Sequence, residues 1–220
     1  MLRILIADDH ELARRGIRDL LETHPGWEVC GEARDGRESV DLAISMKPDV
    51  VLLDIGMPNL NGLEATRQIL AATPDVAILI LTMHDSDNVV REGLRAGAKG
   101  FLLKSDAGRD LVAAVEALQL QRTFFTTRVS QMVLDGFLNR RSNGQEEREQ
   151  NPAGDVLTSR EREVIQLLAE GKTSKEVAVA LNLSVKTAET HRTNLMRKLD
   201  LHSVADLTRY AVRNGIVQVF

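Results

Sequence analysis

The chain has 220 residues, a net charge of −4 at pH 7 and a single cysteine, Cys30. This length allows one large or two small domains, either of which could bury a core. One cysteine excludes a disulfide framework. The short apolar stretch at the amino terminus contains Arg3 and stops at two aspartates, so it is neither a signal peptide nor a membrane span. We therefore expect a cytoplasmic protein without a membrane partner.

The charge is unevenly distributed along the chain. Residues 155–220 carry ten Lys/Arg against eight Asp/Glu, so the excess of negative charge lies in residues 1–154. This asymmetry indicates different partners for the two parts. It is too mild to identify a nucleic-acid-binding protein by itself.

Short apolar runs alternate five times with longer helical patterns between Leu2 and Leu120. This order is typical of a parallel sheet with helices on both faces. The predicted class is α/β, with a doubly wound, five-stranded parallel sheet, followed by a small all-α domain. Strands are predicted near 2–7, 27–33, 49–54, 76–82 and 99–103, and helices near 10–23, 36–46, 62–72, 86–96 and 107–120.

A linker is predicted after this first domain. Thr126 to Leu138 has apolar residues at helical spacing and is expected to form an extra helix. Asn139 to Gly154 contains only one apolar residue, Ala153, and cannot bury enough surface to order itself. The predicted division is residues 1–122 as the first domain, 123–154 as the linker helix and flexible linker, and 155–220 as the second domain.

Four helical segments with clear boundary signals follow the linker. The first and second segments begin with the Thr and Glu of a capping box, and the third and fourth each begin after a serine. A glycine ends the first segment, and another ends the fourth. Only four residues separate the second segment from the third, which is helix-turn-helix geometry. The signals are Thr158 with Glu161, Thr173 with Glu176, Ser184, Ser203, Gly171 and Gly215.

Acidic side chains end two of the predicted strands. Asp8 and Asp9 follow the apolar run 4–7, and Asp54 follows the run 50–53. The carboxyl ends of the strands in such a sheet form the ligand crevice, so these carboxylates are expected to meet there. At ~4 Å and an effective dielectric constant near 20, each like-charged pair costs about 4 kcal/mol. The cluster therefore requires a cation or the uptake of protons.

The residue types favour Mg²⁺ and phosphoryl transfer. Oxygen ligands without a nearby Cys or paired His suit Mg²⁺ better than zinc. Asp8 and Asp9 would hold the metal, and Asp54 would be the nucleophile that becomes an aspartyl phosphate. Lys104 would neutralise the phosphoryl oxygens, and the hydroxyl of Thr82 would donate to them. A lone strand-end Asp is usually a turn or helix cap, but the coincidence of all these strand-end residues favours a functional site.

The third carboxy-terminal helix has two distinct faces. At 100° per residue from Val185, Ala188 and Leu195 point toward a core and Lys186 points away from it, toward a candidate DNA major groove. Flanking cations would contact phosphates, whereas Glu189 and Lys186 could reach base edges. The alternative is a polar face that is merely solvated. The predicted DNA-binding residues are Lys186, Thr187, Glu189, Thr190, Arg192, Thr193, Asn194, Arg197 and Lys198.

Residues 1 to about 122 resemble a two-component receiver domain. The resemblance implies that a partner histidine kinase phosphorylates Asp54 and that Mg²⁺ is held by the predicted aspartates and the backbone carbonyl of Gly56. It also implies a switch in which Thr82 rotates toward the phosphate and Phe101 turns inward. The segments that carry the resemblance are Asp8-Asp9, 53–58, Leu81-Thr82 and 100–104.

Three residues depart from the usual receiver pattern. Phe101 has no hydroxyl where many receivers carry Tyr, and Ser105 replaces the Pro that often follows the lysine. Gly56 offers the metal its carbonyl but has no side chain to screen the phosphate from water.

Segments 157–164, 171–178 and 183–192 resemble the LuxR-type helix-turn-helix, so the whole chain is similar to a NarL/FixJ-type response regulator. The resemblance implies a transcriptional regulator that binds double-stranded DNA as a homodimer once phosphorylated. We predict no enzymatic activity beyond its own phosphorylation and dephosphorylation.

Two other functions remain open. An aspartyl-phosphate hydrolase would need a second acid two residues after Asp54, where Gly56 stands. The other is a DNA-binding regulator without phosphate control, or an adaptor with a vestigial site.

Overall fold

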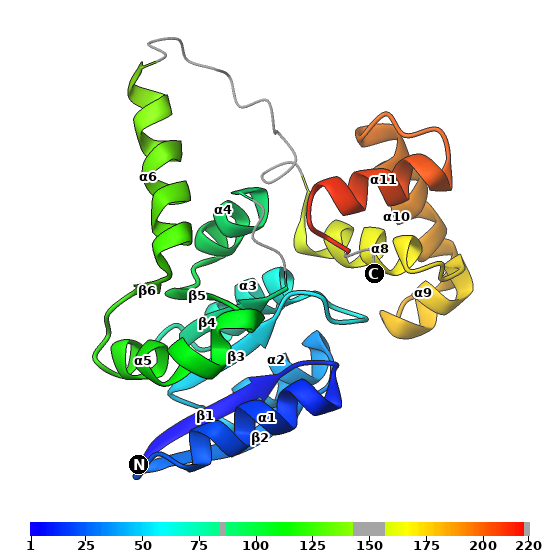
Figure 1. Cartoon of the computed structure of the whole chain (residues 1–220). Coiled ribbons are helices and arrows are strands. Elements are labelled where there is room, and N and C mark those ends of the chain that lie inside the picture. The colour runs from blue at the N-terminus through cyan, green and yellow to red at the C-terminus, as the bar shows by residue number, and fades with distance from the viewer. Residues whose placement is uncertain (84–86, 143–156, 218–220) are drawn as a thin grey trace.

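The computed structural model of the chain describes residues 1–83, 87–142 and 157–217. Its first part is a doubly wound α/β domain whose parallel strands lie in the order β2-β1-β3-β4-β5-β6 (Figure 1). The strands are β1 (Leu2–Ala7), β2 (Trp27–Ala33), β3 (Val50–Asp54), β4 (Ala77–Thr82), β5 (Gly100–Leu103) and β6 (Phe124–Phe125). The helices are α1 (Glu11–Glu22), α2 (Gly36–Met46), α3 (Gly62–Ala72), α4 (Asp87–Ala96), α5 (Ala107–Gln119) and the short 3₁₀ helix η1 (Lys104–Asp106).

The prediction of five strands was wrong by one, because the sheet has six. The additional strand, β6, contains only Phe124 and Phe125, which pair with Gly100 and Phe101 at the edge of the sheet. Two residues are too few to produce an alternating pattern, so periodicity could not reveal this strand.

Alternate side chains of each central strand supply two separate cores. Ile4 and Leu52 point to the face covered by α1 and α5, whereas Leu5 and Val51 point to the face covered by α2, α3 and α4. All four side chains are fully buried. Both faces of the sheet are covered, which explains why these strands are continuously apolar rather than alternating.

Helix α6 (Thr127–Ser142) extends from the sheet edge beyond β6 (Figure 1). Val129 is buried and Met132 packs against the core beneath α4. A helix is therefore present where the sequence predicted one. Residues 143–156, which include most of the predicted flexible linker, lie outside the described residues.

The second part of the chain is a four-helix domain. Its core contains Val164, Ala178, Leu195 and Leu207, one from each helix. Both predicted capping boxes are present, with reciprocal hydrogen bonds at the starts of α8 and α9. The helices are α8 (Ser159–Ala169), α9 (Ser174–Ala180), α10 (Val185–Lys198) and α11 (Val204–Arg213).

The two domains lie against each other through α3, the loop before it, α8 and the segment after α11 (Figure 1). Arg162 of α8 donates to the buried Glu64 of α3 at 2.8 Å. Arg37 of α2 lies 3.1 Å from Glu163, the next residue of α8. Within the described part of the chain, no helix is long and apolar enough to cross a membrane.

Candidate functional site

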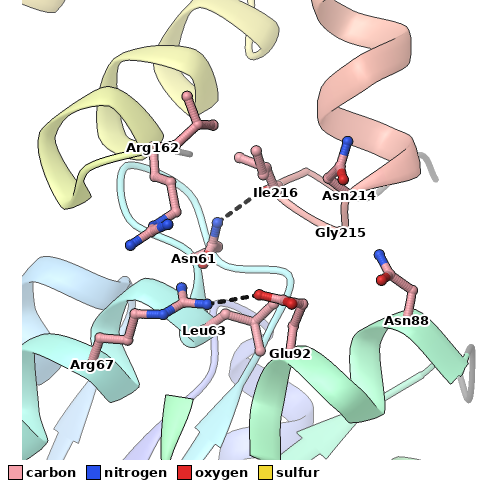
Figure 2. A pocket seen from close by; sticks show the side chains of 10 residues that line it. Asn61, Leu63, Arg67, Asn88, Glu92, Arg162, Asn214, Gly215 and Ile216 are labelled. Atoms are coloured by element: carbon pink, nitrogen blue, oxygen red, sulfur yellow. Dashed lines mark hydrogen bonds and ion pairs between the residues drawn. The ribbon is translucent and has the colours of Figure 1, made fainter. Parts of the chain in front are cut away.

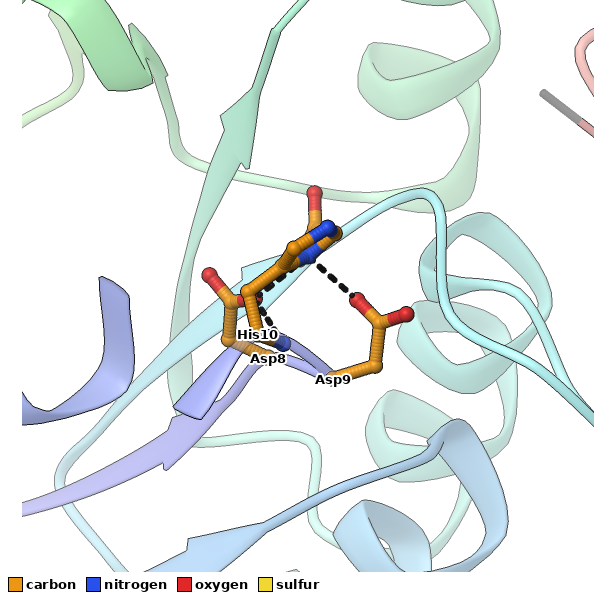
Figure 3. A group of neighbouring side chains, drawn as sticks. Asp8, Asp9 and His10 are labelled. Atoms are coloured by element: carbon orange, nitrogen blue, oxygen red, sulfur yellow. Dashed lines mark hydrogen bonds and ion pairs between the residues drawn. The ribbon is translucent and has the colours of Figure 1, made fainter. Parts of the chain in front are cut away.

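The acidic residues predicted to meet do converge at the carboxyl end of the sheet. Asp54 is the last residue of β3 and is 3% exposed, and Asp8, which directly follows β1, is completely buried. Asp8, Asp9, His10 and Asp54 each offer an atom suited to a metal, and these atoms lie within 4.8 Å of one another. Figure 3 shows Asp8, Asp9 and His10 at the end of β1. Such concentrated negative charge requires compensation by cations.

Lys104 supplies one of these cations. Its ammonium nitrogen lies 2.8 Å from Oδ2 of Asp8 and 2.9 Å from Oδ2 of Asp54. Burial alone would lower the pKa of Lys104, but attraction to Asp54 and hydrogen bonds to Asp8 and Asp54 raise it above its usual value. Lys104 therefore remains charged and connects the two buried carboxylates.

One ammonium group leaves the site short of positive charge. Burial raises the pKa of the Asp54 carboxyl above its usual value, and the nearby Lys104 offsets this only in part. Asp8 and Asp9 add further negative charge, which raises the pKa of Asp54 in the same direction. A divalent cation beside the three aspartates would remove this cost.

The donor set fits Mg²⁺. Oδ2 of Asp8 and Oδ1 of Asp9 are buried, and each is contacted by one nitrogen, Nζ of Lys104 and Nδ1 of His10 respectively, both at 2.8 Å, which leaves a further lone pair on each oxygen. Their lone pairs are therefore available to a hard cation that prefers carboxylate oxygens and retains water ligands.

His10 is a member of this cluster that the sequence analysis missed. Its Nδ1 lies 2.8 Å from Oδ1 of Asp9, and its main-chain N–H donates to Oδ1 of Asp8 at 2.9 Å. Its sequence spacing shows no metal-ligand pattern, so spacing alone did not predict it as a member of the site. Its position directly after two strand-end aspartates was the available signal.

Arg14 is a second residue that the sequence analysis missed. It is almost completely buried in α1, where it donates to the carbonyl oxygen of Asp8 at 2.7 Å and to Glu32 of β2 at 2.8 Å. It therefore links α1 and the edge strand to the end of β1. Arg14 shares the buried face of α1 with Ile17 and Leu21. A cation on an apolar helical stripe was the signal that could have identified it.

Glycine allows the chain to fold closely around Asp54. The N–H of Gly62 donates to the carbonyl of Ile55 at 3.0 Å, which closes the loop between β3 and α3. A Cβ atom at Gly62 would overlap the carbonyl oxygen of Asp54. Asn61 then caps α3 by accepting from the N–H of Glu64 at 2.9 Å. The position of Asp54 thus depends on a loop that packs directly against its backbone.

Thr82 and Phe101 occupy neighbouring strands beside this site. Thr82 is the last residue of β4 and is completely buried. Phe101 is also completely buried, beneath α4, where a Cβ atom on Gly93 would lie only 2.8 Å from its ring. We expected Phe101 to turn inward after phosphorylation. Its ring already points inward in this structure, so that expected movement does not start from this conformation.

Helix α10 carries the predicted DNA-binding residues. Ala188 and Leu195 are buried in the domain core, as the helical spacing predicted. The predicted DNA-binding residues are exposed, except Arg192, which is half-buried. Lys198 lies 2.8 Å from Glu161, the capping residue of α8, so this cation already has an acidic partner within the domain. The other cations among the predicted residues are Lys186, Arg192 and Arg197.

Comparison with family models accounts for both parts of the chain. Residues 4–116 match the response regulator receiver domain, and residues 155–211 match the bacterial regulatory proteins of the luxR family. These two regions contain the acidic site and the four-helix domain, respectively.

Curated relatives are similar over nearly the whole of this chain. The transcriptional regulatory protein LiaR of Bacillus subtilis is 37% identical over 217 residues, which cover 99% of this chain and 100% of LiaR. The response regulator UvrY of Escherichia coli is 34% identical over 216 residues, which cover 98% of this chain and 96% of UvrY.

Solved structures are similar over nearly the whole length. RcsB from Salmonella enterica serovar Typhimurium, bound to the promoter rprA with the phosphomimetic BeF₃⁻, matches with a TM-score of 0.59 and 28% identity over 95% of this chain and 97% of RcsB. A structure of two RcsB dimers on two parallel DNAs matches with a TM-score of 0.58 and 27% identity over 97% of this chain and 98% of RcsB. This chain belongs to the two-component response regulators that combine a receiver domain with a LuxR-type DNA-binding domain.

Proposed function

We propose that Asp54 accepts a phosphoryl group from a histidine kinase in a Mg²⁺-dependent step, and that this modification switches dimerisation and DNA binding. The observation that supports this most is the buried Asp54 carboxylate at the end of β3, linked by Lys104 to Asp8. A buried carboxylate with a cation and further acidic groups around it is suited to phosphoryl transfer, in which positioning and charge stabilisation dominate.

The residues of the site would divide the work as follows. Asp8, Asp9, Asp54 and the backbone carbonyl of Gly56 would hold Mg²⁺. The bound ion would neutralise charge on the carboxylates and on the incoming phosphoryl oxygens. A carboxylate oxygen of Asp54 attacks phosphorus, the P–N bond of the phosphohistidine breaks, and the imidazole leaves with the bonding electrons.

Two further side chains would contact the phosphoryl group once it is attached to Asp54. Lys104 would pair with a phosphoryl oxygen, because its ammonium group already lies within 2.9 Å of Asp54. Thr82, at the end of the adjacent strand, would donate its hydroxyl to the phosphoryl group.

Residues 1–122 would act as the phosphoacceptor unit, 123–154 as the linker, and 155–220 as the DNA-binding unit. In the last of these, the face of α10 that includes Lys186, Thr190 and Arg197 would enter the major groove of double-stranded DNA. The active form would be a homodimer on paired half-sites.

The test compares the purified protein with Asp54→Asn and with Asp75→Asn, a control at an exposed aspartate before β4. The proteins are incubated with Mg²⁺ and acetyl phosphate, and phosphorylation and affinity for selected DNA are measured. We expect wild type and Asp75→Asn to become acid-labile phosphoproteins with altered DNA affinity, and Asp54→Asn to do neither. An Asp54→Asn variant that responds like wild type would contradict the proposal.

A further inference from the structure

One side chain of the DNA-binding domain binds the loop that follows the proposed phosphoacceptor. Gln166 of α8 is 1% exposed, and its side-chain amide lies against the loop between β3 and α3. Its carbonyl oxygen accepts from the main-chain N–H of Asn61 at 2.7 Å, and its NH₂ group donates to the main-chain carbonyl of Met57 at 3.1 Å. A single amide thus binds both ends of the segment 57–61.

This pair of hydrogen bonds depends on one conformation of the loop. Asn59 has a positive φ of 64°, and the N–H of Leu60 donates to the carbonyl of Pro58 at 2.7 Å, which makes the segment a tight turn. Only such a turn brings the Met57 carbonyl and the Asn61 N–H together in front of one amide. A buried amide that loses its hydrogen-bond partners is left with an uncompensated desolvation cost. Docking of the two domains is therefore sensitive to the shape of this loop.

The same loop forms one wall of a cavity that reaches the acidic site. This cavity of about 140 Å³ is lined by Asp9, Gly56 and Met57 of the receiver, and by Gln166 and Glu170 of α8. Gly56, whose carbonyl is a proposed metal ligand, directly precedes Met57. A displacement of Gly56 toward a metal or a phosphoryl group would therefore also move the carbonyl that Gln166 binds.

Other contacts between the domains stabilise docking without involving Gln166. Figure 2 shows the side chain of Asn61 directed at the carbonyl of Ile216, with a hydrogen bond of 2.9 Å. Gln68 of α3 donates to Glu163 of α8 at 2.9 Å. Gln68 and Gln166 are thus two helical glutamines at one interface: Gln68 of α3 binds a side chain of α8, whereas Gln166 of α8 binds the loop that follows Asp54.

We propose that Gln166 is the positioning residue through which occupancy of the phosphoacceptor site controls docking of the DNA-binding domain. This proposal rests on the proposed function. Occupancy shifts the 57–61 turn, the two hydrogen bonds of Gln166 are lost, and the domains separate. Because coupling between two equilibria is reciprocal, docking also weakens binding of the phosphoryl group to the receiver.

The test measures the docking equilibrium of the full chain by energy transfer between two fluorophores. These are attached at Asp75→Cys and Lys175→Cys in a Cys30→Ser background, and the probe is BeF₃⁻ with Mg²⁺. The compared variants are Gln166→Leu and the matched control Gln68→Leu. Gln166→Glu, which has nearly the same size, guards against a folding defect.

We expect BeF₃⁻ to reduce the docking constant of wild type about tenfold, which corresponds to a coupling of ~1.4 kcal/mol. Gln68→Leu weakens docking both with and without BeF₃⁻, but the ratio of the docking constant without BeF₃⁻ to that with BeF₃⁻ stays at the wild-type value. Both Gln166 variants reduce the ratio to less than twofold, and Gln166→Leu binds BeF₃⁻ more tightly than wild type.

The proposal is overturned if the Gln166 variants keep the wild-type ratio, or if Gln68→Leu loses it equally. In those cases the proposed function stands, because BeF₃⁻ still separates the wild-type domains. If BeF₃⁻ leaves wild-type docking and DNA affinity unchanged, the proposed function and this proposal fail together.

Discussion

The ammonium nitrogen of Lys104 lies 2.9 Å from Oδ2 of Asp54, and both groups are largely removed from solvent. Asp54 is the last residue of β3, and Lys104 directly follows β5. Strand β4 lies between these two strands. The pair leaves a net negative charge in the site, because Asp8 and Asp9 also lie there. This concentration of like charges is therefore a cost to the stability of the fold.

Removing the charge of Asp54 is expected to stabilise the protein. The pKa of Asp54 is higher in the folded protein than its ordinary value, so the folded state binds this proton more tightly than the unfolded chain. Stability is therefore lost as the pH rises above about 4 and Asp54 ionises. Without Mg²⁺ at pH 7, we expect Asp54→Asn to increase the free energy of unfolding by about 1 kcal/mol.

Urea denaturation from pH 3.5 to pH 7.5 measures this effect. The advantage of Asp54→Asn grows with pH and shrinks when Mg²⁺ is added, because the ion stabilises the folded wild type. Asp75→Asn, at an exposed position, changes little. A variant less stable than wild type at pH 7 would contradict this explanation.

Arg14 is expected to support the metal site from α1. Arg14→Met removes the donor to the Asp8 carbonyl and leaves Glu32 with only Arg18 as a cationic partner. We expect a loss of about 2–3 kcal/mol in the free energy of unfolding. The affinity for Mg²⁺, measured by isothermal titration, should also fall. Arg15→Met changes the adjacent, exposed arginine and should alter neither the free energy of unfolding nor the affinity for Mg²⁺. Equal effects of the two substitutions would contradict the prediction, because they would not depend on the contacts of Arg14.

Gly62 is expected to tolerate no side chain. Gly62→Ala places a methyl group against the carbonyl oxygen of Asp54 and within 3.0 Å of the Ile55 Cα, both of which are backbone atoms that cannot rotate away. We expect a loss of about 3 kcal/mol in thermal or urea denaturation, with reduced phosphorylation by acetyl phosphate. Gly16→Ala is the control, because no atom lies within 4 Å of its Cβ position in α1. That variant should gain about 0.5–1 kcal/mol, and a comparable loss at both glycines would contradict the prediction.

Arg197 is expected to contact DNA phosphate or base edges from the exposed face of α10. If it contacts a phosphate, Arg197→Ala should reduce the slope of log affinity against log salt by about 1. If it contacts a base, the salt slope should change less and discrimination at one position of the DNA site should fall. Titrations of selected DNA at several salt concentrations separate these outcomes. Lys99→Ala, in the receiver, is the control, and unchanged binding by Arg197→Ala would remove this residue from the interface.

Local sequence patterns predicted most of the fold. The buried runs 50–53 and 4–7 became central strands, and the spacing of Thr158 and Glu161 became an observed capping box. Strand-end acids predicted the location of the site, because parallel strands place their carboxyl ends together. These features depend on residues close in sequence or on a general rule of the fold.

Features that depend on distant contacts could not be predicted in this way. Gln166 and Asn61 are 105 positions apart, and no periodicity relates an amide on one domain to a loop on another. The inward position of Phe101 depends on the space that Gly93 leaves beneath α4. Arg14 would have been counted as a surface cation without knowledge that Asp8 and Glu32 face it.

Helix α10 makes none of the described hydrogen bonds or ion pairs between the domains. Among the hydrogen bonds and ion pairs of residues 1–83, 87–142 and 157–217, those that join the domains come from α8 and its C-cap, from the last residue of α11 and from the segment after it, and none comes from α10. With the domains docked, the α10 side chains that we propose for DNA contact are exposed, except the half-buried Arg192. Under the proposed function, the receiver would act on this helix by fixing where it points relative to the same helix in a second molecule, so that DNA binding would depend on how two copies are aligned.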